Sequence, residues 1–185
     1  MVKRLFIGID FNTVEKDYFY QIQMMVAKYC ESARFSDVTN FHLTLKFIGG
    51  VEESNVDDLI HLIDKLDANQ LELRFDHIGF FAKKNRYILY IGCLPNYKLT
   101  QLANKINDEV ASLGLCEKEQ PIYTPHLTLA RQAKLLVPSV DLSRGIEVDK
   151  LVKINNITLY ESKNIEGELK YIPLYVRQLK EESRG

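Results

Sequence analysis

Two copies of the tetrapeptide His-Leu-Thr-Leu contain the side chains of this chain that are best suited to chemistry. The first copy begins at His42 and the second at His126, in a sequence of 185 residues with only four histidines. Imidazole is the side chain best suited to proton transfer near neutral pH, and a threonine hydroxyl is a neutral hydrogen-bond donor. Each copy therefore supplies one proton-transfer group and one donor that can bind an oxyanion.

Each copy is predicted to be a β-strand, because apolar and polar residues alternate along it. Alternate side chains of a strand share a face, so His42 and Thr44 are expected on one face and their leucine neighbours in the core. His126 and Thr128 are expected to share a face in the same way. If the two strands face each other across a cleft, two histidines and two threonines meet in one site.

This set of groups suits in-line attack at a phosphorus atom. A neutral histidine accepts a proton from the attacking water, and a protonated histidine gives one to the departing sugar oxygen. The threonines bind the non-bridging oxygens as negative charge develops in the transition state. This chemistry needs no metal and no other cofactor, and the sequence contains neither H-E-x-x-H nor Cys-His zinc-ligand spacing. His61 and His77 lack the motif and are interpreted as a surface residue and a sheet residue.

The elements that must position the two motifs alternate loosely between helix and strand. The helices are predicted from apolar residues at helical spacing and cover residues 14–30, 54–66 and 96–114. The strands are predicted from alternation and flanking turn residues and cover residues 5–9, 41–48, 71–81, 87–94, the second motif, 154–161 and 170–178. Gly49-Gly50 is predicted to end the second strand, and residues 134–149 to form a loop with one short turn. Several strands are hairpin neighbours, which favours an α+β fold with antiparallel sheet.

Composition and charge limit the class of protein. The chain is 46% hydrophobic and 26% charged, which fits one globular domain over residues 1–185. The net charge of −1 excludes a strong field over the whole surface, so any RNA contact must be local and favours an RNA end or a single nucleotide. Because each motif follows an amphipathic helix, we expect two similar lobes within the domain.

Cysteine content and the N-terminal segment indicate a cytoplasmic protein. The three cysteines are odd in number and widely spaced, which fits a reducing compartment and argues against a disulfide framework. The apolar run in MVKRLFIGIDF is too short for a secretory signal or a membrane span. No association with membranes is expected, and no protein partner is indicated.

The residues around the motifs resemble those of the 2H phosphoesterases, a family named for two H-x-T-x motifs. The similarity is greatest to the LigT-like RNA 2′,3′-cyclic phosphodiesterases, also called RNA 2′,5′-ligases, and covers nearly the whole chain. The matching segments are RLFIGID (4–10), NFHLTLKFIGGV (40–51), YTPHLTLAR (123–131), and LYES (159–162) followed by Gly167 and a strand with tyrosine. The resemblance implies a bilobal, duplicated α+β fold with two antiparallel sheets flanked by helices and a central cleft. It also implies metal-free opening of 2′,3′-cyclic phosphates to 2′-phosphates, together with reversible 2′,5′-ligation.

Residue roles follow from the resemblance by position. It implies that His42 is the proton donor and His126 the proton acceptor, and that Thr44 and Thr128 bind the phosphate. It also implies that the substrate is an RNA end or a nucleoside 2′,3′-cyclic phosphate.

Two cations near the motifs are further candidates for binding the phosphate. The resemblance implies that Arg131 contacts the phosphate or the nucleotide. Strict alternation puts Arg131 on the leucine face, so it reaches the site only if the strand ends or bulges after Leu129. The same alternation puts Lys46 on the face of His42. Either residue is otherwise a solvated basic side chain.

One departure from the family and three alternative functions stay open. Family members often have a tryptophan shortly before the first motif, whereas here Phe35 fills that position, as a core residue or as a stacking surface for a base. The alternatives are a 3′-to-5′ RNA exonuclease of the same superfamily, a non-catalytic module that binds RNA ends, and a metal site at His42 and His126. The metal site is disfavoured because no carboxylates accompany the histidines.

Overall fold

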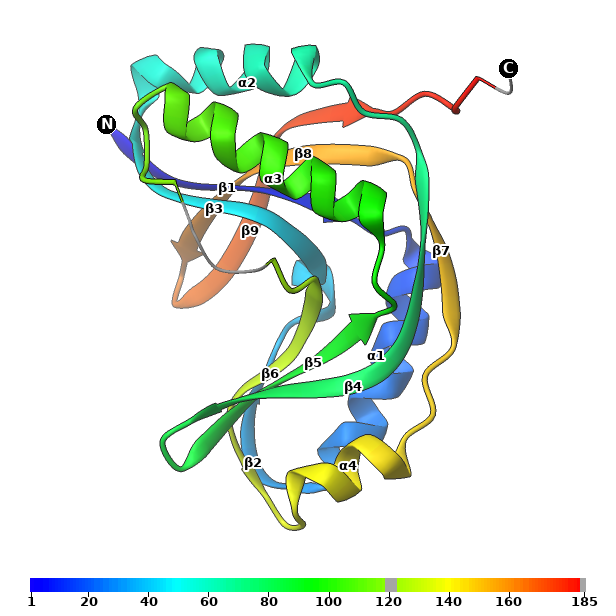
Figure 1. Ribbon diagram of the computed structural model, residues 1–185. Coiled ribbons are helices and arrows are strands. Elements are labelled where there is room, and N and C mark those ends of the chain that lie inside the picture. The colour runs from blue at the N-terminus through cyan, green and yellow to red at the C-terminus, as the bar shows by residue number, and fades with distance from the viewer. Residues whose placement is uncertain (119–122, 184–185) are drawn as a thin grey trace.

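Two antiparallel β-sheets form the framework of the protein (Figure 1). The computed structural model describes residues 1–118 and 123–183. Sheet A consists, in spatial order, of β3 (His42–Glu52), β1 (Val2–Asp10), β8 (Asn156–Ile165) and β9 (Glu168–Gln178). Sheet B consists of β2 (Cys30–Phe35), β6 (His126–Leu135), β5 (Arg86–Cys93), β4 (Leu71–Lys83) and β7 (Lys150–Ile154). The predicted α+β class with two antiparallel sheets is confirmed, and the division of one domain into two lobes stays a prediction.

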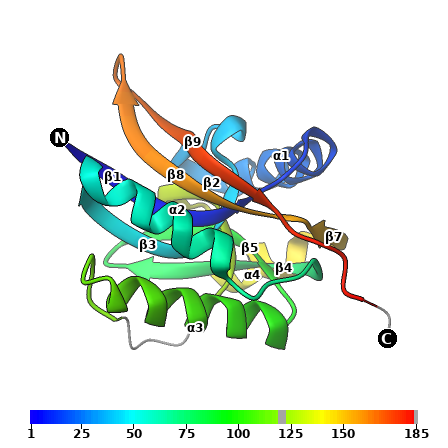
Figure 2. The same cartoon turned by 90° about the horizontal axis from the view of Figure 1, so that it is seen from above.

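Helices flank both sheets. On sheet A, α2 (Val56–Lys65) contacts β8 and β9, and α3 (Tyr97–Ser112) contacts β3. On sheet B, α1 (Thr13–Ala27) contacts β2, and α4 (Ser139–Gly145) contacts β4. Figure 2 shows α2 and α3 side by side, with α1 well apart from them. In the described part of the chain, no helix has the length and apolar character needed to cross a membrane.

Two helix starts follow from local capping. The side-chain oxygen of Asn12 accepts a hydrogen bond from the Glu15 amide at 2.8 Å, and that of Asn96 accepts one from the Leu99 amide at 2.9 Å. Each bond satisfies an amide that has no partner within the helix, which fixes where the helix begins.

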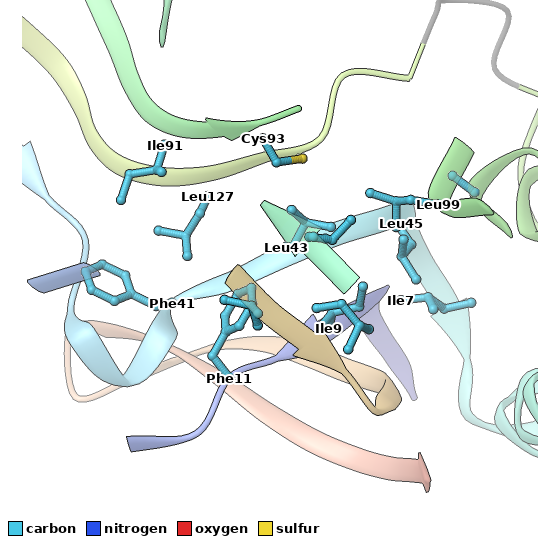
Figure 3. Close-up of a cluster of buried hydrophobic side chains, with 14 of the residues drawn as sticks. Ile7, Ile9, Phe11, Phe41, Leu43, Leu45, Ile91, Cys93, Leu99 and Leu127 are labelled. Atoms are coloured by element: carbon cyan, nitrogen blue, oxygen red, sulfur yellow. The ribbon is translucent and has the colours of Figure 1, made fainter. Parts of the chain in front are cut away.

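The core anchors the two motif strands (Figure 3). Leu43 of β3 and Leu127 of β6 are fully buried, among side chains such as Ile7 and Ile9 of β1 and Ile91 of β5. Burying one such aliphatic side chain contributes about 1.5–3 kcal/mol. The leucines of the motifs therefore fix the strands, and the opposite faces of the same strands are left for polar side chains.

The predicted first helix was too long. It ends at Ala27 rather than at residue 30, and Cys30–Phe35 forms β2, which pairs with β6. Within this helix, Phe19 and Val26 are buried, whereas Met25 is exposed. Apolar residues occur on several sides of this segment, so their spacing alone did not identify the buried side.

Two further predictions in the chain were wrong. Gly49-Gly50 does not end β3, because Gly49 adopts a φ of +94° at an irregularity in the pairing with β1, and the strand continues to Glu52. The predicted loop over residues 134–149 contains α4, and β7 follows it as a strand that was not predicted. The structure of these segments depends on contacts with strands that are distant in the sequence, and a local sequence pattern does not reveal such contacts.

Candidate active site

The structure brings both motifs to one cavity. β3 and β6 contact each other, and His42, Thr44, His126 and Thr128 line a cavity of about 470 Å³. The remaining lining residues are Arg4, Phe6, Phe47, Arg131, Ser162, Leu169 and Tyr171. A cavity of this size lies within the usual range for small-molecule sites.

A bulge in β6 turns Arg131 toward this cavity. Thr128 pairs with Tyr90 and Ala130 pairs with Leu89, so Leu129 has no partner of its own on β5. The alternation shifts by one residue at this point, which is the effect of a β-bulge. Arg131 therefore lies on the same face as His126. This is the placement expected if the strand bulges near Leu129.

Two long-range hydrogen bonds satisfy the bulged residue. The carbonyl of Leu129 accepts one from the Ser36 amide and one from Nε2 of Gln23, each at 2.9 Å. Gln23 comes from α1 and is buried. The contact that supports the bulge thus comes from a helix more than a hundred residues earlier in the chain.

A bulge at the matching position of β3 has the opposite effect on Lys46. Thr44 pairs with Gly8 and Lys46 pairs with Ile7, so Leu45 is skipped. Lys46 is only 2% exposed, and its Nζ donates to Oδ1 of Asn107 at 2.9 Å. The expectation that Lys46 shares the face of His42 was wrong, because the bulge turns it to the buried side.

Phe47 occupies the place on β3 that Arg131 occupies on β6. Each lies three residues after the motif threonine, and each lines the cavity. Phe47 was not predicted as a site residue from the sequence. The equal spacing of the two residues in HLTLKF and HLTLAR was the signal that could have identified it.

Removing the Lys46 charge is expected to affect stability and not binding. We expect Lys46→Met to lower the free energy of unfolding by about 1–3 kcal/mol, because the change removes the hydrogen bond that the buried ammonium donates to Oδ1 of Asn107. Lys134→Met is the matched control, since Lys134 pairs with Glu31 on the surface and such pairs contribute about 0–1 kcal/mol. Urea unfolding measures both variants. A rise in the KM of Lys46→Met as large as that caused by a change at Arg131 would contradict this placement.

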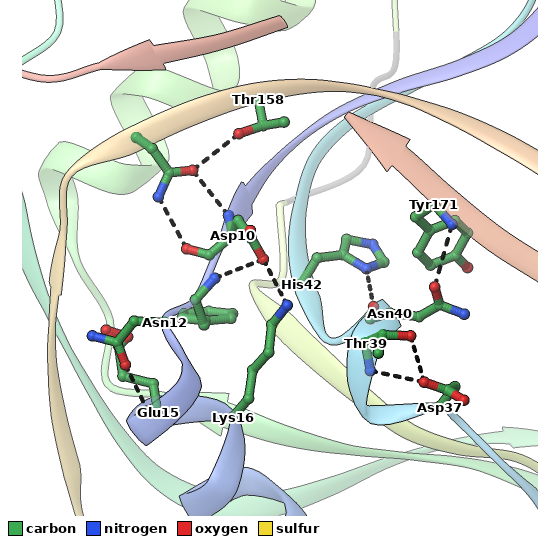
Figure 4. Close-up of polar contacts among 12 residues, drawn as sticks. Asp10, Asn12, Glu15, Lys16, Asp37, Thr39, Asn40, His42, Thr158 and Tyr171 are labelled. Carbon is green, nitrogen blue, oxygen red and sulfur yellow. Dashed lines mark hydrogen bonds and ion pairs between the residues drawn. The ribbon is translucent and has the colours of Figure 1, made fainter. Parts of the chain in front are cut away.

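Backbone carbonyls fix both imidazoles in the same way. Nδ1–H of His42 donates to the Asn40 carbonyl at 2.8 Å (Figure 4). Nδ1–H of His126 donates to the Thr124 carbonyl, also at 2.8 Å. In the neutral ring, Nε2 is then the acceptor nitrogen. In His42 this nitrogen accepts a hydrogen bond from Oγ1 of Thr44 at 2.8 Å.

Neighbours from sheet A hold His42 in place. The side chain of Asn40 donates to the Leu169 carbonyl at 2.8 Å and accepts from the Tyr171 amide at 3.2 Å, which ties the residue that orients His42 to β9 (Figure 4). The rings of Phe6 and Tyr171 each lie 4.8 Å from the imidazole of His42. The ring has little freedom to turn away from the cavity.

Burial makes both histidines weaker bases than usual. Burial is the largest cause that lowers the pKa of His42 to about 4; the charges of His126 and Arg131 act in the same direction, and the Asn40 carbonyl and the Asp10 carboxylate oppose them. Burial, and then the charge of Arg131, also lower the pKa of His126. Both imidazoles are therefore mainly neutral near pH 7 in the unliganded protein.

The charges around the cavity favour an anion. Arg4 and Arg131 line it, and its described lining residues include no carboxylate. Arg4 also lies over the ring of Phe47, 5.1 Å from its centroid. Within residues 1–118 and 123–183, no group of three His, Cys, Asp or Glu side chains is arranged to hold a metal ion.

Several functional candidates differ from the sequence analysis. Besides Phe47, four lining residues were not predicted as site residues, although they lie in or beside segments that carry the family resemblance: Arg4, Phe6, Ser162 and Tyr171. Of the two roles considered for Phe35, core packing was wrong, because its side chain is 39% exposed. His61 and His77 are exposed and lie outside the cavity.

This chain is similar to known proteins in sequence and in fold. The RNA 2′,3′-cyclic phosphodiesterase of Methanocaldococcus jannaschii is 26% identical over 178 residues, which cover 93% of this chain and 90% of that protein. The Escherichia coli protein of the same name is 28% identical over 147 residues, 78% of each chain. The crystal structure of E. coli LigT complexed with 3′-AMP matches with a TM-score of 0.81 at 28% identity, over 97% of this chain and 99% of that one. A sequence model of the 2′-5′ RNA ligase superfamily matches residues 20–141, more than half of the chain, and the chain therefore belongs to that superfamily.

Proposed function

We propose that this protein hydrolyses 2′,3′-cyclic phosphates, at RNA ends or in nucleosides, to 2′-phosphates. The observation that carries the proposal is the pair of equivalent His–Thr units, one from each sheet, in a single cavity whose described lining residues include arginine and no carboxylate. The relatives named RNA 2′,3′-cyclic phosphodiesterase support the same substrate. We also propose a cytoplasmic location, which the three free cysteines support.

The two histidines divide the proton transfers. Nε2 of neutral His126 accepts a proton from water as the water oxygen attacks phosphorus. The bond between phosphorus and O3′ breaks, and O3′ takes a proton from Nε2 of charged His42. The product keeps the phosphate on O2′, and exchange of protons with solvent restores both rings.

Hydroxyls and a cation stabilise the charge that develops on the phosphate. Thr44 and Thr128 donate to the non-bridging oxygens, and the guanidinium of Arg131 lies on the same face of the site. The hydroxyl of Thr44 must leave Nε2 of His42 to do so. The anionic substrate favours the charged form of His42, so binding itself prepares the proton donor.

Removing Arg131 is expected to weaken substrate binding and to shift the pH dependence. A hydrogen bond to a charged group contributes about 1.5–3 kcal/mol, so we expect Arg131→Met to raise KM by roughly 10- to 150-fold. Because Arg131 lowers the pKa of both histidines, the alkaline limb of kcat/KM should also move to higher pH. Arg144→Met on α4 makes the same charge change outside the cavity and is the control. An unchanged KM would exclude Arg131 from the phosphate site.

The identity of the product tests the proposed function. With a nucleoside 2′,3′-cyclic phosphate and EDTA, we expect turnover to a 2′-phosphate, identified by phosphorus NMR against authentic standards. A clean 3′-phosphate would reverse the orientation of the substrate. Release of mononucleotides from the 3′ end of an uncyclised RNA would instead favour an exonuclease, and binding without turnover would favour a non-catalytic module.

A further inference from the structure

A groove continues from the catalytic cavity on the side of His42. Its volume is about 580 Å³, and His42, Thr128 and Arg131 line both the groove and the cavity. Thr44 and His126 line the cavity and are not among the described lining residues of the groove. The groove lies between the end of β2 and the hairpin of β8 and β9, and we refer to it as the β2 groove.

The β2 groove lies on the side of the leaving oxygen. In the proposed reaction, water attacks phosphorus from the side of His126, and O3′ departs toward His42, roughly in line with the attack. The sugar that carries O3′ therefore lies on the side of His42. Any chain attached to O5′ of that sugar extends away from His126, and the β2 groove is a space that the structure offers in this direction.

Two arginines lie opposite each other in the β2 groove. Arg34 of β2 and Arg131 of β6 are partners in the register of these antiparallel strands, and both line the groove. Like charges directly opposite each other on paired strands destabilise the pair. Among residues 1–118 and 123–183, neither guanidinium forms an ion pair. An anion bound beside both arginines would remove their repulsion.

The two carboxylates of the β2 groove have other partners. The carboxylate of Asp37 accepts a hydrogen bond from the Thr39 amide at 2.8 Å (Figure 4). Glu168 forms an ion pair with Lys170 at 2.9 Å. The described lining contains three cations and these two carboxylates, so it carries a net positive charge. The arginines are therefore available to an anionic ligand.

Arg34 lies one strand farther from the catalytic cavity than Arg131. It is exposed, and it is not among the described lining residues of that cavity. Adjacent strands are about 4.8 Å apart, so the guanidinium of Arg34 reaches a group that is close to the reacting phosphate but distinct from it. On the sugar side of a nucleic acid, the next anion is the phosphate on O5′ of the terminal nucleoside.

We propose that Arg34 binds the phosphodiester on O5′ of the terminal nucleoside, which makes the end of an RNA chain a better substrate than a free nucleoside 2′,3′-cyclic phosphate. This inference rests on the proposed function, because the direction of the chain follows from the assignment of His42 as the proton donor. A guanidinium binds phosphate oxygens through charge-assisted hydrogen bonds. Such a contact positions the chain and does not read its bases.

Two dinucleotides separate the charge of the linkage from the added nucleoside. In each, 2′-deoxyadenosine is joined through its 3′ oxygen to O5′ of adenosine 2′,3′-cyclic phosphate, so only the terminal cyclic phosphate can open. One linkage is a phosphodiester, and the other is a methylphosphonate, which has a similar shape and no charge. The formation of 2′-phosphate gives kcat/KM for both. A hydrogen bond between charged groups at an exposed site predicts a preference of about 10-fold for the phosphodiester.

Two arginine variants test the assignment of the contact to Arg34. Arg34→Met keeps a long apolar side chain without the charge, and it is expected to bring the ratio of the two kcat/KM values close to one. Arg144→Met makes the same change at an exposed position on α4 outside the groove, and it is expected to keep the ratio. Added salt is expected to lower the ratio in the unmodified protein, because it screens exposed charges.

The outcomes distinguish this inference from the proposed function. Equal kcat/KM values for the two dinucleotides in the unmodified protein would overturn the role of Arg34 and leave the hydrolase intact, and so would a full preference in Arg34→Met. Hydrolysis of adenosine 2′,3′-cyclic phosphate without hydrolysis of either dinucleotide would exclude a chain from the groove. Absence of 2′-phosphate from all three substrates would overturn the proposed function, and this inference with it.

Discussion

Replacement of His42 or His126 by alanine is expected to lower kcat by about 10²–10⁴-fold in each case. Each imidazole carries one of the two proton transfers, and the described residues that line the cavity include no third histidine and no carboxylate that could replace it. Both side chains lie on the cavity face of their strands, while the leucines beside them hold the core. The variants should therefore keep the fold, as circular dichroism and urea unfolding would show. Near-full activity in either variant would contradict the two-histidine mechanism.

The choice of leaving group assigns the two roles. A nitrophenolate departs without a proton, so an enzyme that lacks its proton donor should recover activity on a nucleoside 4-nitrophenyl phosphodiester. We expect His42→Ala to lose much less activity on this ester than on a cyclic phosphate, and His126→Ala to lose a similar amount on both. The reverse pattern would exchange the donor and the acceptor.

The parts of the fold that local sequence determines were predictable. The motif strands follow from alternation, and α3 follows from the Asn96 cap and from apolar residues at helical spacing, such as Leu99 and Ile106, which are buried. In contrast, β2 and β7 exist because they pair with β6 and β4, which are far away in the sequence. A local sequence pattern does not reveal such long-range pairing, and the predictions failed in the segments whose structure depends on that pairing.

In the candidate site too, some residue positions follow from local sequence and others depend on long-range contacts. Strict alternation correctly groups the histidine and threonine of each motif, and it fails just after them, where a bulge in each strand shifts the face by one residue. The bulge moves Lys46 into the interior and Arg131 into the cavity. The side chain of Gln23, more than a hundred residues from Leu129, satisfies the second bulge. Only the fold brings these groups together.

The depressed pKa values of the two histidines lead to the second large expected effect. His42 has a pKa of about 4, so at pH 7 only a small fraction of the imidazoles carry the required proton in the unliganded protein. The pKa of His126 is lowered as well. A pKa lowered by burial means that the proton is lost as pH rises through an unusually low value. The active form, with one proton shared between the two rings, is therefore most abundant at acidic pH in the free protein.

The pH profile of kcat/KM reports the pKa values of the free enzyme, and that of kcat reports the pKa values of the enzyme–substrate complex. The two profiles are therefore expected to differ. The alkaline limb of kcat/KM should lie below pH 6.5, the ordinary histidine pKa. The limb of kcat should lie at higher pH, because the bound phosphate anion favours the charged imidazole of His42. Each limb belongs to the coupled pair and not to one residue.

Steady-state kinetics on a nucleoside 2′,3′-cyclic phosphate from about pH 4 to pH 9, with EDTA present, measure both profiles. Two bells displaced from each other, with KM rising as pH increases, would support proton transfer by a pair of buried histidines that the substrate itself charges. A single rise of kcat/KM through neutral pH that requires a divalent ion would indicate metal-activated hydroxide instead. In that case the shared Nδ1–carbonyl geometry of His42 and His126 would orient two ligands, and the likeness of the two motifs would no longer imply an acid and a base.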